Sequence, residues 1–491
     1  MSVSNRRAAR SALRAIAVAL LLMPLFVPSP ILAQGVEPAT ARIAAELRAQ
    51  ALDPETSEAY AFVRDLTIEV GPRLAGSDGD RRGVAWSLVR LKELGFDNVR
   101  AEPVTVPVWR RGGMIAEVTA PHVQPMVAVA LGGSVGTKNV GIEAPVLRVE
   151  SLAALDALPA DAARGQIVYI DERMERTRSG AGYSAAVMKR VIGASSAAAK
   201  GAVALLIRSV GTSNNRIAHT GTMRYRPDTP RIPAAALSNP DADQLTGLLA
   251  RGPVTFRLGM GSGFHGEAES ANVLAEVTGG AQADEIVLLA CHLDSWDLGT
   301  GALDDGVGCA IVVEAARLIG RLAAAQPEAR PRRTIRVFLA ANEEFGLSGA
   351  RAYGLVYDAS LDKHVAAMES DFGGGAVYAM SSDFDRNDPA VGPLIDDLLA
   401  LLAPLGITYE DREPYGGADI NWLRPRAGVP LLDLSQDGTD YFDLHHTVND
   451  VLAQVDPDDL RQNVAAHAVV AYVLANHPRA LPRLTPVADE D

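Results

Sequence analysis

The sequence contains only two cysteines, Cys291 and Cys309, among its 491 residues. This scarcity excludes the disulfide framework that holds many small secreted domains together. Cys291 ends a run that is typical of a buried strand, and Cys309 lies in the first turn of an expected helix. We therefore expect two buried free thiols, with a bridge between them as the alternative.

Positive charge is also scarce. Lysine and arginine number 46 against 60 aspartates and glutamates, which gives a net charge of −14. Because an acidic chain lacks the basic patch that binds phosphates, we expect no nucleic-acid partner. Repeats and low-complexity tracts are absent. With 48% hydrophobic residues the chain can bury a large core, and its length favours two or three domains.

Long apolar runs are missing except near the start of the chain. Arg6, Arg7, Arg10 and Arg14 precede an apolar stretch over 15–27, and small residues follow up to Ala33. This layout predicts a signal peptide over 1–33, because the run is shorter than the roughly 20 residues that a spanning helix needs. We expect an exported protein, periplasmic or secreted, with no membrane span after cleavage. An uncleaved anchor is the alternative.

The pattern of expected secondary structure changes at two points along the chain. Residues 110–266 alternate short β-rich runs with turns and carry no cluster of acid–base or metal-ligand residues, which indicates an inserted β-rich domain. Strands and helices alternate from Asn272 onward, which predicts an α/β domain around a largely parallel sheet flanked by helices. We assign 34–109 and 267–491 to this catalytic domain. Ligands of such sheets bind beyond the carboxyl ends of the strands.

Side chains of the kinds that bind metals follow three of these expected strands and recur in a late loop. The expected strands cover 286–290, 335–340 and 365–368. Strand ends at one edge of a sheet bring such side chains together. The four pairs are His292 and Asp294, Glu343 and Glu344, Glu369 and Asp371, and His445 and His446.

Imidazole and carboxylate ligands together suit zinc. The carboxylates exceed the needs of one ion, which suggests two ions, and two ions need a bridging carboxylate. Asp304, at the start of a helix, is the candidate bridge. One ion would take His292 and Asp371, and the other would take Glu344 and His446.

Proton transfer needs a group beside the ligands. Glu343 adjoins a ligand yet would point elsewhere, so it is the candidate general base. Asp294 could accept the imidazole proton of His292 and fix the orientation of the ring, and Asp450 could do the same for His446.

Each cluster has a simpler interpretation when it is taken alone. A His-x-Asp pair can be a surface feature, Glu-Glu can be a solvated helix start, and Asp304-Asp305 can be a helix cap. All four clusters in order, mostly at strand ends, favour a functional site. His219 and His265 are candidates for its rim, while the other histidines are expected to pack or to be solvated.

These motifs carry a family resemblance. The sequence around His292 to Gly306, the Asn342–Gly346 motif, Glu369-Ser370-Asp371 and Asp440–Thr447 resemble the co-catalytic dizinc aminopeptidase and carboxypeptidase family, particularly its carboxypeptidase Q type. The resemblance implies two Zn²⁺ ions, Glu343 as base, Asp304 as bridge, and ligands His292, Asp304, Glu344, Asp371 and His446.

The resemblance also extends outside the metal ligands. It implies that the insert is a protease-associated-type domain, and it prefers His446 over His445 because the family ligand lies four residues before an aspartate, here Asp450. Val451 stands where the family usually has Thr. The loop containing Gly417 resembles a substrate-side loop, for which a structural turn is the alternative. Three residues are candidates for substrate binding: His445, Tyr441 and Gly417.

The function that follows from the resemblance is removal of one residue from a short peptide, most often a dipeptide, by a carboxypeptidase or dipeptidase. An aminopeptidase on longer peptides is the nearest rival. A catalytically inactive receptor-like ectodomain and a one-zinc glutaminyl cyclase are rivals of other classes. The intact ligand set and the base argue against both. The expected partner is a short peptide substrate. For the oligomeric state, a homodimer is one of the alternatives.

Overall fold

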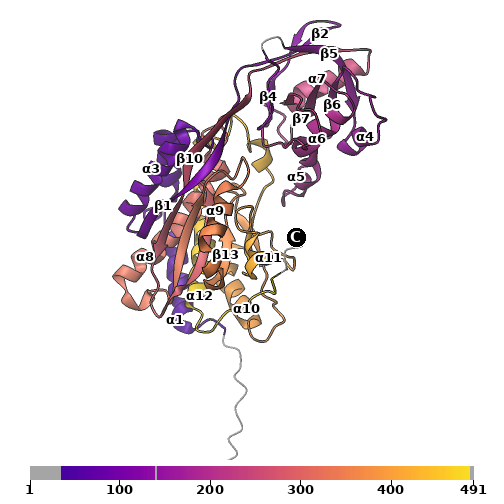
Figure 1. The fold of residues 1–491 in the computed structure, drawn as a ribbon. Coiled ribbons are helices and arrows are strands. Elements are labelled where there is room, and N and C mark those ends of the chain that lie inside the picture. Colours follow the sequence, from indigo (N-terminus) through magenta and orange to yellow (C-terminus); the bar gives the residue numbers. More distant parts are fainter. Residues whose placement is uncertain (1–34, 139–140, 487–491) are drawn as a thin grey trace, which may run out of the picture.

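The computed structural model describes residues 35–138 and 141–486, so the predicted signal peptide lies outside the described residues. Figure 1 shows two groups of elements that the long strands β1 and β10 connect. The main sheet has five strands in the order β1-β10-β12-β11-β13. Their bounds are Asp97–Arg110, Gly263–Val277, Arg333–Ala340, Gln282–His292 and His364–Glu369.

This sheet is mixed, whereas the sequence predicted a largely parallel one. Strand β11 runs parallel to β12 and to β13, but β1 pairs antiparallel with β10, and β10 pairs antiparallel with β12. The reason is the path of the chain. It leaves the sheet along β1 and returns along β10, and a strand that retraces its neighbour must run antiparallel to it. The prediction held for the three strands that carry metal-type residues.

Helices cover both faces of the main sheet. Alternate residues of β11 and β12 enter two different clusters of buried side chains, with Leu289 and Val337 in one and Leu288 and Phe338 in the other. Such two-sided burial is why these strands appear in the sequence as continuous apolar runs. The helices of this part are α1 (Pro38–Leu52), α2 (Ala59–Asp65), α3 (Asp78–Glu93), α8 (Val307–Ala325), α9 (Ser348–Tyr357), α10 (Gly392–Leu402), α11 (Leu423–Ala427) and α12 (Pro457–Asn476).

The closing helix α12 begins as the sequence predicts. Pro457 occupies its first turn, and the Asp456 carboxylate accepts hydrogen bonds from the backbone N–H groups of Asp458 and Asp459. In residues 35–138 and 141–486, no helix combines the length and apolarity needed to cross a membrane.

A second sheet is built entirely from the residues between β1 and β10, which we call the 114–260 segment. Its eight strands follow the order β3-β2-β9-β5-β6-β7-β8-β4. The strands β2 to β9 are Met114–Ala120, Gln124–Pro125, Ala128–Ala130, Ile142–Val149, Ile167–Ile170, Ala204–Arg208, Ala234–Leu237 and Thr255–Met260.

The 114–260 segment holds more helix than its sequence suggested. Strands β5 to β8 pair in parallel, so the chain needs crossover connections between them, and helices supply most of these. The helices are α4 (Leu152–Asp156), α5 (Ala181–Ala186), α6 (Met188–Ala199) and α7 (Asn239–Leu249). A small third sheet, β15-β14-β16 (Thr408–Tyr409, Val377–Ser382, Leu432–Gln436), lies beside the main one through a bridge from Ala367 to Leu431.

The expectation of free thiols was wrong. Cys291 and Cys309 form a disulfide that joins the end of β11 to the first turn of α8. Cys291 does point to the opposite face of the strand from His292, as a period of two requires. That face is the one that α8 covers, and the first turn of the helix presents Cys309 there.

Removing this disulfide is expected to destabilise the protein. The two cysteines are 18 residues apart, and closing a loop of that length contributes about 3 kcal/mol in the chain-entropy model. The double variant Cys291→Ala/Cys309→Ala should therefore unfold at lower urea concentration than the wild type. The wild-type protein, unfolded without reductant, should show no titratable thiol. Two free thiols in that assay would contradict the assignment.

Candidate metal centre and active site

The carboxyl ends of β11, β12 and β13 bring the predicted residues to one edge of the sheet. His292 is the last residue of β11 and pairs in register with Ala340, the last residue of β12. Ala290 pairs with Glu369, the last residue of β13. The loops that carry Asp304, Glu343 and Asp371 therefore start at neighbouring points.

Two imidazole rings face the two oxygens of one carboxylate. His292 Nε2 lies 3.2 Å from Asp304 Oδ1, and His446 Nε2 lies 3.1 Å from Asp304 Oδ2. Each ring also meets a second carboxylate. His292 Nε2 is 3.3 Å from Asp371 Oδ1, and His446 Nε2 is 3.0 Å from Glu344 Oε2. The five side chains thus form two half-sites that share Asp304.

The electrostatics of the cluster follow from this packing. Burial alone would lower the pKa of His292, but the carboxylates of Asp371 and Asp304 outweigh it and raise that pKa well above its usual value. The pKa of His446 is also raised well above its usual value. Burial would lower it, but the carboxylates of Glu344 and Asp304 outweigh that effect. Burial would raise the pKa of Asp304, yet hydrogen bonds with both imidazoles hold it well below its ordinary value.

The adjacent glutamates point in different directions. Asn342, just before them, has the left-handed backbone angle φ 59°, which turns the chain sharply after β12. The Glu344 carboxylate accepts a hydrogen bond from Trp296 Nε1 and lies against His446. The Glu343 carboxylate lines the cavity described below. It has no side-chain partner in the described part of the chain. Burial raises the pKa of Glu343 well above its usual value, and repulsion from Asp371 adds to the rise despite the opposing effect of His292.

Asp294 does not hold His292 in the way that the sequence predicted. His292 Nδ1 lies 3.0 Å from the backbone carbonyl of Asp294, while the nearest oxygen of the Asp294 carboxylate is 3.8 Å away. The carboxylate instead accepts a hydrogen bond of 2.9 Å from the backbone N–H of Glu343. A neighbour two positions along a turn reaches back more easily with its carbonyl than with its side chain. Asp294 therefore acts on the loop that carries the glutamates.

Asp450 also differs from its prediction. Its carboxylate accepts a hydrogen bond of 2.6 Å from the backbone N–H of Leu303, next to Asp304. His446 Nδ1 lies instead 3.4 Å from the carbonyl of Thr220, in the 114–260 segment. His446 has the left-handed backbone angle φ 61°, and its Nδ1 faces the 114–260 segment.

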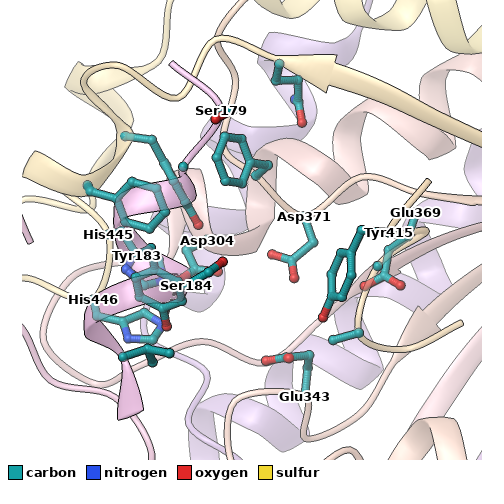
Figure 2. A pocket seen from close by; sticks show the side chains of 18 of the residues that line it. Ser179, Tyr183, Ser184, Asp304, Glu343, Glu369, Asp371, Tyr415, His445 and His446 are labelled. Atoms are coloured by element: carbon teal, nitrogen blue, oxygen red, sulfur yellow. Dashed lines mark ion pairs between the residues drawn. The ribbon is translucent and has the colours of Figure 1, made fainter. Parts of the chain in front are cut away.

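A cavity of about 820 Å³ opens beside the half-sites. Figure 2 shows Glu343 and Asp371 pointing into this space, with Tyr415 and Glu369 on one side and His445, His446 and Tyr183 on the other. His292 and Asp294 are buried behind the wall. The other eight predicted residues line it: Asp304, Glu343, Glu344, Asp371, Gly417, Tyr441, His445 and His446.

The three predicted substrate-binding residues take up distinct positions in the wall. His445 stacks on His446 with ring centres 3.5 Å apart, and burial, assisted by the charge of His446, keeps its pKa well below the usual value. Tyr441 packs against His445. Gly417 has φ 107°, and a Cβ there would lie 2.2 Å from Glu369 Oε2, so only glycine leaves room for that carboxylate.

Comparison with known proteins agrees with this geometry. Residues 272–471 match the model of peptidase family M28. The chain is 36% identical to carboxypeptidase Q of Bos taurus over 429 residues, which cover 87% of each chain. The chain belongs to peptidase family M28. The mouse carboxypeptidase Q is 37% identical over 85% of this chain and 86% of its own.

Solved structures of M28 peptidases share the fold. A peptidase M28 precursor from Shewanella amazonensis superposes with a TM-score of 0.87 at 46% identity, over 91% of this chain and 99% of that one. The aminopeptidase of an Aneurinibacillus strain has a TM-score of 0.61 at 19% identity, which is a likeness of fold alone. This M28 member is a zinc-dependent exopeptidase.

The donor set of this M28 site fits zinc. Imidazole nitrogens and carboxylate oxygens are ordinary zinc ligands, and the structure groups them as His292, Asp304 and Asp371 and as Asp304, His445 and His446. One oxygen of Glu344 is buried without a hydrogen-bond donor in the described chain. Buried carboxylates at this density need cations to compensate their charge.

The sequence missed what the 114–260 segment adds to the M28 site. Tyr183, Arg190 and Arg224 line the cavity. His219, a candidate for the rim, lies behind it, where Nδ1 donates a hydrogen bond of 2.8 Å to the carbonyl of His445. Burial lowers the pKa of His219 to about 4. No local motif marks Tyr183, Arg190 or Arg224, because only the tertiary packing of the segment brings them to the histidine loop.

Proposed function

We propose that this M28 peptidase is a dizinc exopeptidase that hydrolyses dipeptides and similarly short peptides with free ends. The observation that carries the proposal is Asp304. Its two oxygens face two separate imidazole–carboxylate pairs at 3.1 and 3.2 Å, which is the arrangement that a carboxylate shared by two ions requires. His292 and Asp371 would hold one ion, and Glu344 and His446 the other.

His446 suits the second half-site better than its neighbour does. His446 Nε2 reaches both Asp304 and Glu344 within 3.1 Å, whereas His445 Nε2 is 3.6 Å from Asp304 and has no ion-pair contact with Glu344 in the described chain. His445 is better placed to contact substrate, since it lines the cavity and lies farther from both carboxylates.

Zinc supplies Lewis acidity toward water and toward a peptide carbonyl. The protein supplies the proton transfer. Glu343, whose carboxylate faces the cavity, accepts a proton from the attacking water and delivers it to the leaving amine as the C–N bond breaks. Water and the peptide are consumed, and a carboxylate product and an amine product result. The Asp294 carboxylate positions Glu343 by accepting a hydrogen bond from the backbone N–H of Glu343.

The organisation of the chain supports the same proposal. We assign 34–109 and 267–491 to the catalytic domain and 110–266 to an inserted domain of the protease-associated type, since the second sheet is built within that range. We also propose that residues 1–33 direct export. Recovery of Met1 by N-terminal sequencing of protein from fractionated cells would contradict this.

The specificity is tested with dipeptides and aminoacyl-anilides on the zinc-loaded protein. An anilide has no terminal carboxylate, so its kcat/KM should fall at least about 10-fold below that of the matching dipeptide, as expected for a lost charge-assisted contact. Equal turnover of the two would favour the rival function, an aminopeptidase on longer peptides.

A further inference from the structure

The cavity wall contributed by the 114–260 segment carries two arginines that have no carboxylate partner among the described residues. Three arginines line the cavity, and Arg412 is paired with Glu410 and Asp433. Arg190 and Arg224 form no ion pair with any residue in 35–138 or 141–486. Since charged side chains in a protein interior are normally paired, a buried arginine without an anion points to one that arrives from outside.

Arg190 is buried in this wall and is held there by hydrogen bonds. It lies on α6, its side chain is only 5% exposed, and Nη2 donates a hydrogen bond of 2.7 Å to the hydroxyl of Tyr183. Nη1 contacts the Thr220 carbonyl at 3.4 Å, and Nε is buried with no acceptor. Gly221 packs so closely that a Cβ there would lie 2.2 Å from Nη1. The guanidinium is thus fixed in place while part of its donor capacity stays unused.

Arg224 supplies a second positive charge on the same wall. Its backbone N–H is bonded to the Val191 carbonyl, which fixes the position of its Cα near α6. Its side chain is exposed and makes no hydrogen bond or ion pair within the described chain. One guanidinium is therefore buried and held by hydrogen bonds, and the other is exposed with no hydrogen bond or ion pair in the described chain.

The opposite wall has the opposite charge. Glu343, Glu369 and Asp371 line it: Glu369 ends strand β13 of the main sheet, and the other two lie in loops that follow strands of that sheet. Figure 2 shows the Glu369 carboxylate beside Tyr415, across the cavity from Tyr183 and Ser184 of the 114–260 segment. A peptide with free ends is itself positive at one end and negative at the other, so the cavity is complementary to such a molecule.

We propose that Arg190 and Arg224 bind the free C-terminal carboxylate of the substrate, so that the 114–260 segment selects for peptides that end one residue beyond the cleaved bond. This inference rests on the proposed exopeptidase function and adds the residues that recognise the substrate end. Arginine suits the role because its planar fork of donors matches a carboxylate.

The test compares a dipeptide with its C-terminal amide, using the zinc-loaded full chain. Arg224→Gln removes the exposed charge without disturbing a packed contact. It should raise KM for the free dipeptide about 10- to 100-fold with little change in kcat, because the contact is made equally in the ground and transition states. The amide should be unaffected. Arg226→Gln removes an exposed arginine outside the cavity lining and should behave like the wild type.

Arg190→Lys is the second variant, since it keeps the charge but loses the fork. It should also raise KM for the free dipeptide selectively while zinc content stays at the wild-type level. Loss of zinc would instead show that Arg190 acts on His446, which lies 3.5 Å away, and would overturn its part of the proposal.

The remaining outcomes distinguish failure of the proposed carboxylate site from failure of the proposed exopeptidase function. If Arg224→Gln leaves the dipeptide and amide unchanged, or slows both equally, the carboxylate site is wrong although the exopeptidase function stands. If the wild type hydrolyses neither substrate, the proposed function fails. The carboxylate site can then still be tested by calorimetry. The affinities of the dipeptide and of its amide would be measured for Glu343→Gln and for the double variant Glu343→Gln/Arg224→Gln. Equal affinity for the two ligands would overturn it.

Discussion

Replacing Glu343 with Gln should lower kcat at least about 10²–10⁴-fold, the usual contribution of a general base. The variant keeps the size and shape of the side chain but has no carboxylate to accept a proton. Because the Glu343 carboxylate forms no hydrogen bond or ion pair within the described chain, its loss should leave the half-sites intact. The protein should therefore still bind about two zinc ions.

Glu344→Ala is the matched comparison, since it changes the adjacent residue. It removes the carboxylate that lies 3.0 Å from His446 Nε2 and accepts from Trp296 Nε1, so one ion should bind weakly or be lost. Elemental analysis beside steady-state kinetics separates the two roles. Loss of zinc from Glu343→Gln, or full activity with both ions in Glu344→Ala, would show that the roles are assigned wrongly.

Arg73→Met should be among the most damaging substitutions away from the ligands. The Arg73 side chain is 0% exposed and donates hydrogen bonds to the carbonyls of Leu293, Thr300 and Gly301, at 2.6, 2.9 and 2.8 Å. These carbonyls belong to the loop between His292 and Asp304. Without the guanidinium the carbonyls of Leu293 and Thr300 have no donor in the described chain, and that of Gly301 keeps only the backbone N–H of Gly306, which should cost about 3–5 kcal/mol.

The charge of Arg73 matters as well as its donors. Burial lowers its pKa, and the carboxylates of Asp450 and Asp294 oppose that shift, so the guanidinium compensates part of the negative charge around the site. Arg73→Lys, with the charge but fewer donors, should fall between wild type and Arg73→Met in urea denaturation. Arg81→Met should have little effect, since Arg81 is exposed and forms only a surface ion pair. Wild-type stability for Arg73→Met would refute this account.

The sequence was sufficient to predict that the side chains of His292, Glu343 and Asp371 would lie together, for a physical reason. Strands β11, β12 and β13 are buried on both faces, so each appears as an apolar run followed at once by polar residues. Parallel neighbours align their carboxyl ends, which places His292, Glu343 and Asp371 together without knowledge of the rest of the fold.

The remaining features depend on contacts that no local pattern records. The direction of β10 depends on where the chain goes after β1. The Cys291–Cys309 bridge depends on which face of β11 the helix α8 covers. The roles of Asp294 and Asp450 depend on which groups the tertiary packing brings within hydrogen-bond distance. The Asp294 carbonyl lies 3.0 Å from His292 Nδ1 while its carboxylate lies 3.8 Å away, and the Asp450 carboxylate lies 2.6 Å from the backbone N of Leu303.

The disulfide has a consequence for how the site assembles. It closes a covalent ring that contains both His292 and Asp304, one ligand and the shared carboxylate of the proposed centre. In a ring of this size the two side chains stay near each other even when the chain is unfolded. Zinc can then bind weakly before folding is complete, and any such binding reduces the amount by which the metal stabilises the native state. Reduction of the disulfide would increase the entropy that is lost when His292 and Asp304 come together in the unfolded chain.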